Sequence, residues 1–282
     1  MNILSIQSHV AYGHVGNAAA AFALQRLGIE AWPVLTVQFS NHTGYGAWRG
    51  RAFDADLIRE VMQGIGERGV LPSCDGVLSG YMGSAEIGGA IIDAVAQVKA
   101  ANPKAQYCCD PVIGDVGRGV FVQPGIAEFM RAHAVPAAQI VTPNHFELDY
   151  LTGRTTTAIG DVLSAIESLR KRGPRVVMVT SLVAEETPDD SIDLLACDDT
   201  GRYRLRTPKL PISVNGAGDA IAALFFAHHL RTGSAAEAMS RAASAVFGIL
   251  KRTSDMGSRE ILLIEAQDEI VNPGRLFRSE PV

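Results

Sequence analysis

Residues 2–37 read NILSIQSHVAYGHVGNAAAAFALQRLGIEAWPVLTV and contain the pattern that decides the fold. The apolar run at 2–7 predicts a buried strand. The alanine- and leucine-rich stretch 17–27 ends at Gly28, which predicts a helix with a glycine stop. A second apolar run at 31–37 predicts the next strand. This strand–helix–strand unit is typical of a parallel sheet covered by helices.

The same alternation continues along the chain. We expect strands near 75–80, 107–109, 140–141 and 176–179, and helices near 54–66, 85–101, 124–133, 158–172, 217–231 and 235–251. An antiparallel pair is expected at 192–197 and 202–206, and a last helix near 260–271. There is no internal repeat or linker, so we expect one domain over residues 1–282. The predicted architecture is an α/β three-layer sandwich that binds ligands at the carboxyl ends of its strands.

Composition excludes several classes of function. The chain has 282 residues and a net charge of −5, which gives no electrostatic footprint for nucleic acid. It has no basic run for a membrane surface, no apolar run long enough to span one and no signal-peptide pattern, so we expect a cytoplasmic protein. The spacing of the four cysteines fits neither a zinc site nor a disulfide framework, and adjacent Cys108 and Cys109 are expected on opposite faces of a strand.

A glycine turn, Val214-Asn215-Gly216-Ala217-Gly218-Asp219-Ala220, leads into the apolar stretch 221–230. Glycines at 216 and 218 let main-chain amides approach an anion, and a helix start adds free N–H groups and about half a positive charge. Phosphoryl transfer needs such an anion hole, and Asp219 beside it could accept the proton of an attacking hydroxyl. The same residues also fit a glycine-rich loop with an aspartate cap and no catalysis.

Two further motifs follow predicted strands. In Thr142-Pro143-Asn144-His145-Phe146-Glu147, the amide and the carboxylate lie on one side of a helical turn and could hold Mg²⁺, directly or through waters. The alternative is a capping box, in which Asn144 caps a helix and Glu147 closes the box. In Asp110-Pro111-Val112-Ile113-Gly114-Asp115, the first aspartate would project from a strand end toward Mg²⁺ or phosphate, or would belong to a turn.

Ser8 leaves the first predicted strand, which suits a substrate contact. No Gly-x-Ser-x-Gly surrounds it, so it is not a candidate nucleophile. His9 and His14 nearby fit ligands, although we favour solvated or packed side chains. The chain lacks Gly-x-x-x-x-Gly-Lys-Ser/Thr, and no Gly-x-Gly-x-x-Gly follows the first strand. These absences disfavour a P-loop enzyme and a nicotinamide-binding Rossmann domain.

Six blocks of the chain, in order, resemble the pyridoxal kinases of the ribokinase-like superfamily, in the branch often called pyridoxamine kinase. They are Ile6–Val10 through Gly16-Asn17, Thr36–Thr43, Leu78–Gly83, Cys109–Val112, Pro143-Asn144 with Glu147, and Gly216-x-Gly218-Asp219. The first two blocks are much more specific than the glycine turn. They separate this group from sugar kinases and from hydroxymethylpyrimidine kinases.

The resemblance implies a ribokinase-like α/β/α sandwich in which residues 38–51 form a flap that closes over the substrate. Asp219 would be the base, with an anion hole at Gly216, Ala217 and Gly218. The implied substrate site consists of Ser8, His42, Thr43, Gly44 and Tyr81. The implied ATP site consists of Asp110, Thr142, Glu147, Thr180, Thr207, Pro208, Lys209 and Leu210. Of these, Asp110 and Glu147 would face Mg²⁺, directly or through water.

The implied activity is ATP-dependent phosphorylation of the 5′-hydroxymethyl group of pyridoxal in vitamin B6 salvage, by a homodimer. Mg²⁺ is implied, and K⁺ stays open. Thr180 stands where relatives often carry a lysine, and Val120 where some carry a cysteine. Two alternatives stay open. One is a kinase for another hydroxymethyl heterocycle such as hydroxymethylpyrimidine. The other is a pyridoxal-phosphate binding or delivery protein with weak kinase activity, which the intact Asp219 disfavours.

Overall fold

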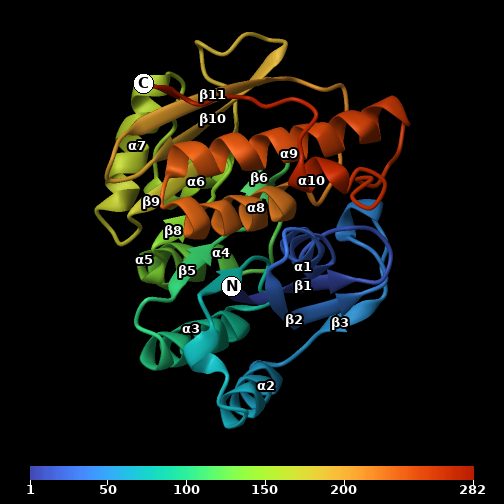
Figure 1. Cartoon of the computed structure of the whole chain (residues 1–282), viewed down its shortest axis with the longest axis vertical. Helices are drawn as coiled ribbons and strands as arrows, with labels where there is room; N and C mark the ends of the chain where they lie inside the picture. The colour runs from blue at the N-terminus through green and yellow to red at the C-terminus, as the bar shows by residue number, and fades with distance from the viewer.

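The computed structural model describes residues 1–282 and contains a ten-stranded sheet, in the order β12-β11-β10-β9-β8-β5-β4-β1-β2-β3 (Figure 1). The inner strands run parallel, as predicted: β1 (Asn2–Val10), β2 (Glu30–Phe39), β4 (Gly76–Ser79), β5 (Gln106–Cys109), β8 (Ile140–Val141) and β9 (Val176–Leu182). The strands at the two edges are antiparallel to their neighbours: β3 (Gly50–Ala52), β10 (Ser191–Cys197), β11 (Arg202–Pro208) and β12 (Glu280–Pro281).

Helices cover both faces of the sheet and make three layers. One face is covered by α2 (Ala55–Glu67), α3 (Ala85–Ala101), α4 (Ile126–Phe129), α5 (Val135–Ala137), α6 (His145–Thr152) and α7 (Ile159–Arg170). The other is covered by α1 (Asn17–Arg26), α8 (Ala217–Thr232), α9 (Ala235–Asp255) and α10 (Asp268–Val271). Helices α1, α8 and α9 lie side by side in front of the sheet in Figure 1. None of these helices has the length and apolar character that a membrane span requires.

Strand residues alternate between two hydrophobic clusters, one on each face of the sheet. In β5, Cys109 joins the cluster beneath α2–α7, whereas Cys108 joins the cluster beneath α1, α8 and α9. This confirms the prediction that the two cysteines lie on opposite faces, because successive side chains of a strand point in opposite directions. All four cysteines are buried and free, in agreement with the absence of a disulfide pattern.

The helix predicted near 260–271 is wrong in extent. Only Asp268–Val271 are helical, and turns precede them. Hydroxyl groups explain the difference, because they hydrogen-bond main-chain groups in place of a helix. Glu260 N donates to Ser258 Oγ at 3.2 Å, and Leu262 N donates to Thr253 Oγ1 at 3.0 Å.

Several smaller features also differ from the prediction. The helix expected at 124–133 starts at Ile126 and passes through a π-helical turn (Met130–Ala134) into α5. No sequence pattern predicted β3, β12 or a separate hairpin of β6 (Gly114–Asp115) and β7 (Gly119–Val120). Strands of two or three residues are too short to show alternating hydrophobicity.

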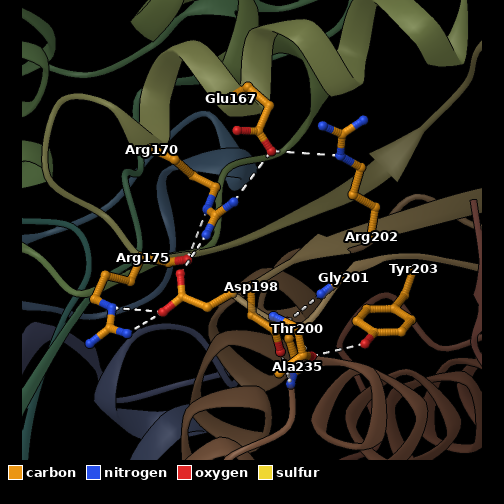
Figure 2. A network of polar contacts seen from close by, with 10 residues as sticks. Glu167, Arg170, Arg175, Asp198, Thr200, Gly201, Arg202, Tyr203 and Ala235 are labelled. Atoms are coloured by element: carbon orange, nitrogen blue, oxygen red, sulfur yellow. Dashed lines mark hydrogen bonds and ion pairs between the residues drawn. The ribbon is translucent and has the colours of Figure 1, made fainter.

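A polar network holds the turn between β10 and β11 (Figure 2). The Asp198 carboxylate accepts hydrogen bonds from Thr200 N, Thr200 Oγ1, Gly201 N and Ala235 N at 2.6–3.1 Å. Burial alone would raise the pKa of Asp198, but these hydrogen bonds outweigh it and lower the pKa. The next residue, Asp199, pairs with Arg170 at 2.7 Å and with Arg175.

This network lies at the amino ends of the parallel strands, because Cys197 at the end of antiparallel β10 pairs with Val177 near the start of β9. It joins the β10–β11 turn to the start of α9, through Ala235, and to α7, through Arg170. The opposite end of the sheet, at the carboxyl ends of the parallel strands, carries the candidate residues from the sequence analysis.

Candidate active site

The predicted site residues follow the carboxyl ends of neighbouring parallel strands. Ser8 lies near the end of β1, Tyr81 follows β4, Asp110 follows β5, and Thr142 follows β8. Thr180 lies near the end of β9, and Thr207 lies near the end of β11, which runs in the same direction as β9 because both pair antiparallel with β10. The fold therefore gathers these side chains at the carboxyl ends of the strands, where open α/β sheets bind ligands.

Two carboxylates, Glu147 of α6 and Asp219 of α8, lie close enough to Asp110, which follows β5, for their charges to act on it. Asp110 and Glu147 are buried, with 7% and 5% of their surface exposed, and Asp219 is half-buried in the first turn of α8. Thr142 Oγ1 donates to Asp110 Oδ1 at 2.9 Å. Burial raises the pKa of Asp110 well above its usual range, and the charges of Glu147 and Asp219 raise it further. Burial also raises the pKa of Glu147 to about 8 and that of Asp219 to about 6.

Like charges that are removed from water repel one another, so the cluster favours either protons or a cation. Glu147 is already bound by main-chain donors: Oε1 accepts from Ile113 N at 2.9 Å, and Oε2 accepts from Asn144 N at 2.9 Å. Asn144 Oδ1 accepts from Glu147 N at 2.9 Å, which completes a capping box at the start of α6. The capping reading of this motif, left open by the sequence, is therefore confirmed.

The chemistry of the carboxylate cluster suits a hard divalent cation, but the number of protein groups that could bind one is small. Carboxylate oxygens are the ligands that Mg²⁺ prefers, and the cluster lacks a compensating positive charge. However, no group of three or more carboxylates, histidines or cysteines is arranged to hold a metal ion by itself. Asp110 has one carboxylate oxygen bonded to Thr142, which leaves the other free for a metal-bound water or a metal. This arrangement fits a magnesium ion whose remaining ligands are water and phosphate.

The glycine turn forms the start of α8. Gly216 is the N-cap residue and has a left-handed φ of 93°, and no side chain caps the helix, so the first N–H groups are free. A Cβ on Gly216 would overlap the main-chain oxygen of His14, so close backbone packing requires glycine there. Gly218 faces open space. The turn therefore presents free N–H groups beside the carboxylate of Asp219, and Gly216 ties it to the loop after β1.

The predicted flap, residues 38–51, is the connection between β2 and β3. Its base is an antiparallel pair with Gln38 opposite Arg51, and its centre is a 3₁₀ turn at Thr43–Tyr45. A Cβ on Gly44 would lie 2.9 Å from Asn215 Nδ2, so the tip of the flap contacts the residue before Gly216. His42 beside it is buried, with 8% of its surface exposed. The flap thus lies against the glycine turn.

The other predicted substrate residues lie beneath and beside the flap. Ser8 is buried against Gly16, where a Cβ would overlap the Ser8 hydroxyl. Tyr81 is half-buried, and its main-chain oxygen accepts from Thr36 Oγ1 at 2.8 Å. His9 and His14 are also half-buried. This burial agrees with the reading of the two histidines as packed side chains.

The predicted ATP residues divide into two groups. Thr180 lies beside the capping box before α6, because its N–H donates to Pro143 O at 3.0 Å and it forms an isolated β-bridge with Asn144. The segment Thr207, Pro208, Lys209 and Leu210 lies further along the sheet, at the end of β11. Its hydrogen bonds run elsewhere: Lys209 N donates to Asp190 O at 2.7 Å, and Leu210 O accepts from Ile212 N. The structure does not bring these four residues into contact with Asp110 or Asp219.

Three residues at this edge escaped sequence reasoning. Ser181 next to Thr180 has a φ of 52°, a left-handed conformation that is uncommon outside glycine. Glu260 contacts the flap through His42 and Tyr45. Neither Ser181 nor Glu260 belongs to a motif, and the stretch around Glu260 resembled the start of a helix. Tyr45 lies within the predicted flap, but no spacing rule connected it to a residue 215 positions away.

Comparisons with known proteins agree with this architecture. A family model described as phosphomethylpyrimidine kinase matches residues 34–263. Pyridoxal kinase PdxY of Granulibacter bethesdensis is 58% identical over 99% of both chains. Pyridoxal kinase PdxY of Deinococcus radiodurans is 55% identical over 100% of this chain and 96% of its own.

Solved structures agree as well. Pyridoxal kinase from Leishmania donovani in complex with ADP and pyridoxamine is 28% identical, and the match covers 100% of this chain and 99% of that one with a TM-score of 0.93. The match in fold thus extends over the whole chain. Together with sequence identities above 50% over full length, it settles the family: the chain belongs to the pyridoxal kinases.

Proposed function

We propose that this protein transfers the γ-phosphoryl group of ATP to the 5′-hydroxymethyl group of pyridoxal, which gives pyridoxal 5′-phosphate in vitamin B6 salvage. Full-length relatives named pyridoxal kinase support the reaction, and the solved relative from Leishmania donovani holds ADP together with a B6 vitamer. The observation that carries the proposal is Asp219, a half-buried carboxylate at the start of α8 beside free main-chain N–H groups.

Asp219 acts as the general base. Burial raises its pKa to about 6, so at neutral pH the carboxylate is mostly ionised yet more basic than an ordinary aspartate. It takes the proton of the hydroxymethyl group, whose oxygen forms a bond to the γ-phosphorus while the bond from that phosphorus to the β,γ-bridging oxygen breaks and ADP leaves. The N–H groups of Gly216, Ala217 and Gly218 stabilise the charge on the transferring group.

Asp110 and Glu147 face the phosphates. Mg²⁺, when bound with ATP, supplies the positive charge that the phosphates and the carboxylate cluster need. Asp110 would hold the ion through its free oxygen, and Glu147, whose oxygens accept main-chain N–H groups, would act through water. An assay with and without K⁺ tests whether a monovalent ion adds to this site.

The remaining roles complete the proposal. Ser8, His42, Thr43, Gly44 and Tyr81 bind pyridoxal beneath the flap. Thr142 and Thr180 line the phosphate side, and Thr207 to Leu210 face the adenine side. Residues 1–282 act as one kinase domain in a cytoplasmic homodimer, and sedimentation of the purified protein tests the dimer.

The test is a kinase assay on a small panel of alcohols with ATP and Mg²⁺. The panel contains pyridoxal, pyridoxamine, pyridoxine and hydroxymethylpyrimidine, the last because the matching family model is named for phosphomethylpyrimidine. We expect the highest kcat/KM with pyridoxal. A clear preference for hydroxymethylpyrimidine would contradict the proposal. Tight binding of pyridoxal phosphate with negligible turnover would favour a delivery protein instead.

A further inference from the structure

A polar cluster joins the flap to a distant part of the chain. Oε1 of Glu260, in the segment 258–263 that follows α9, accepts a hydrogen bond from Tyr45 Oη at 2.6 Å. His42 Nε2 lies 2.9 Å from the same oxygen and is the donor there, because a carboxylate only accepts. The Glu260 side chain is 11% exposed and that of His42 is 8% exposed. Both flap residues therefore bind one buried carboxylate oxygen.

The surroundings of Glu260 are shaped for this side chain. Gly13, in the loop after β1, has a φ of 93°, and a Cβ there would overlap Glu260 Oε2. The guanidinium of Arg259 stacks 3.9 Å from the centre of the Tyr45 ring and covers its outer side. Three segments that are far apart in sequence thus meet around one carboxylate, at the side of the molecule where the blue loop between β2 and β3 meets the red loop between α9 and α10 in Figure 1.

Glu260 itself is held firmly. Its N–H donates to Ser258 Oγ at 3.2 Å, and Ser258 Oγ donates back to Glu260 O at 2.7 Å. The next residue, Ile261, is buried and packs against the glycine turn, since a Cβ on Gly216 would lie 3.1 Å from Ile261 Cδ1. The carboxylate is therefore fixed relative to the anion hole.

The flap tip lies between this anchor and the glycine turn. A Cβ on Gly44 would lie 2.9 Å from His42 Nδ1 and 2.9 Å from Asn215 Nδ2, which leaves the tip no free space on that side. Whatever fixes His42 and Tyr45 therefore fixes Thr43 and Gly44 between them. Glu260 Oε2 and His42 Nδ1 are buried without a hydrogen-bond partner. Unpaired buried polar atoms are rare in folded proteins because they lower stability, so this pair calls for an explanation.

We propose that Glu260 is a positioning residue that holds the flap over the glycine turn through its hydrogen bonds to Tyr45 and His42. A fixed flap keeps Thr43 and Gly44 in place for the alcohol and keeps water away from the γ-phosphate. Without Glu260, the flap opens more often, the alcohol binds less well, and water takes its place as the attacking oxygen to give ADP and inorganic phosphate. The kinetic part of this inference rests on the proposed kinase function, but the structural part does not.

The structural part is tested by amide hydrogen exchange of the ligand-free protein. Four amides in residues 40–49 are hydrogen-bonded: Ser40 N to Arg49 O, Tyr45 N to His42 O, Gly46 N to Thr43 O, and Arg49 N to Ser40 Oγ. In Glu260→Ala, residues 40–49 should exchange about tenfold faster or more, since the loss of a hydrogen bond to a charged group costs more than the about 1.4 kcal/mol that a tenfold change represents. In Glu260→Gln the increase should be smaller, because the amide oxygen still accepts from Tyr45. Exposed Glu265 gives the matched control, Glu265→Gln, in which exchange should not change.

Tyr45→Phe removes only the hydroxyl of the same bond and should also speed exchange in residues 40–49. It serves if Glu260→Ala does not fold. The turn at 198–201, at the other end of the sheet, is the internal reference and should keep its exchange rate in every variant. Exchange in residues 40–49 that equals the wild type in both Glu260→Gln and Tyr45→Phe would overturn the proposal.

The kinetic part is tested on the same variants. With Glu260→Ala we expect KM for pyridoxal to rise about tenfold, kcat to change less, and ATP hydrolysis without alcohol to rise relative to transfer. Glu260→Gln should recover part of the KM. A loss of kcat with unchanged KM would contradict the positioning role. Faster flap exchange in a protein whose wild type does not phosphorylate pyridoxal would uphold the anchor and reject the kinase proposal.

Discussion

Two buried aspartates at opposite ends of the sheet, Asp198 and Asp110, have opposite surroundings. At the amino end, the Asp198 carboxylate accepts four hydrogen bonds, and its pKa is lowered despite burial. At the carboxyl end, Asp110 accepts one side-chain hydrogen bond and faces two other carboxylates, and burial raises its pKa well above the usual range. Both residues are 7% exposed.

The difference shows where the fold is stabilised and where it is prepared for chemistry. A satisfied buried charge holds secondary structure together, whereas an unsatisfied one is tolerated where a ligand will complete it. Substitutions at the amino end should therefore change stability and leave catalysis alone. Substitutions of Asp110 and Asp219 at the carboxyl end should change catalysis without lowering stability.

The largest effect is expected for Asp219→Asn. Removal of the base should lower kcat for pyridoxal about 10²- to 10⁴-fold, and stability should not fall, because the variant has one buried charge fewer. Steady-state kinetics and thermal unfolding of the same preparation measure both quantities. Turnover within tenfold of the wild type would show that Asp219 is not the base.

Asp198→Ala is the counterpart at the amino end. Four donors lose their acceptor, and at about 0.5–1.5 kcal/mol for each bond we expect about 2–6 kcal/mol of lost stability in urea unfolding. KM and kcat should stay close to wild-type values at 25 °C. A change in KM without a change in stability would contradict the division between the two ends.

The pH dependence of kcat/KM should show an acid limb near pH 6. Asp219, whose pKa is about 6, must be ionised to accept a proton, so activity is full above that pH and falls about tenfold for each unit below it. Asp110 and Glu147 interact with the same site, so the measured value belongs to the cluster. A profile that stays flat down to pH 5 would mean that Asp219 titrates as an ordinary aspartate.

Asp110→Asn should raise stability at alkaline pH. The folded-state pKa of Asp110 lies above its unfolded value, so its contribution to stability is full below the unfolded pKa and is lost as the pH rises through the folded one. Asparagine keeps an oxygen for Thr142 and carries no charge. We expect the Tm difference between variant and wild type to grow from pH 5 to pH 9 and to reach about 2 °C or more. A difference that is constant with pH would exclude charge as its cause.

The smallest effect is expected for Asp199→Ala, a neighbour of Asp198 in the same turn. Its carboxylate pairs with Arg170 and Arg175, but 48% of the side chain is exposed, so water already screens both pairs. We expect about 0–1 kcal/mol of lost stability. The comparison with Asp198→Ala separates buried hydrogen bonds from surface charge within two adjacent residues. A loss as large as that of Asp198→Ala would remove this distinction.

The sequence was a good guide wherever an element had a long pattern. The first strand was predicted from an apolar run, the first helix from an alanine- and leucine-rich stretch that ends at Gly28, and β10–β11 as an antiparallel pair; the structure confirms all of them. The helix prediction was wrong for residues 260–267. The hydroxyls of Ser258 and Thr253, which lie outside this segment, accept hydrogen bonds from its main-chain N–H groups.

The sequence also predicted that Asp110 and Thr142 lie at the same end of the sheet, because each residue directly follows a predicted parallel strand. Whether Glu147 caps a helix or faces a metal depends on which donors reach it, and those come from Ile113 and Gly114, more than thirty residues earlier. The contact of Glu260 with the flap likewise depends on a separation that no local pattern records.

The adjacent thiols of β5 make the two helical layers separately observable. Cys108 and Cys109 are both fully buried, on opposite faces of one strand, and burial raises the pKa of Cys109 to about 12 and that of Cys108 well above its usual range. An alkylating reagent reaches either sulfur only after the helices that cover it have separated from the sheet. In variants that keep one thiol at a time, the labelling rate reports how often one helical layer opens. Comparison of the two rates shows whether the two layers open together or separately.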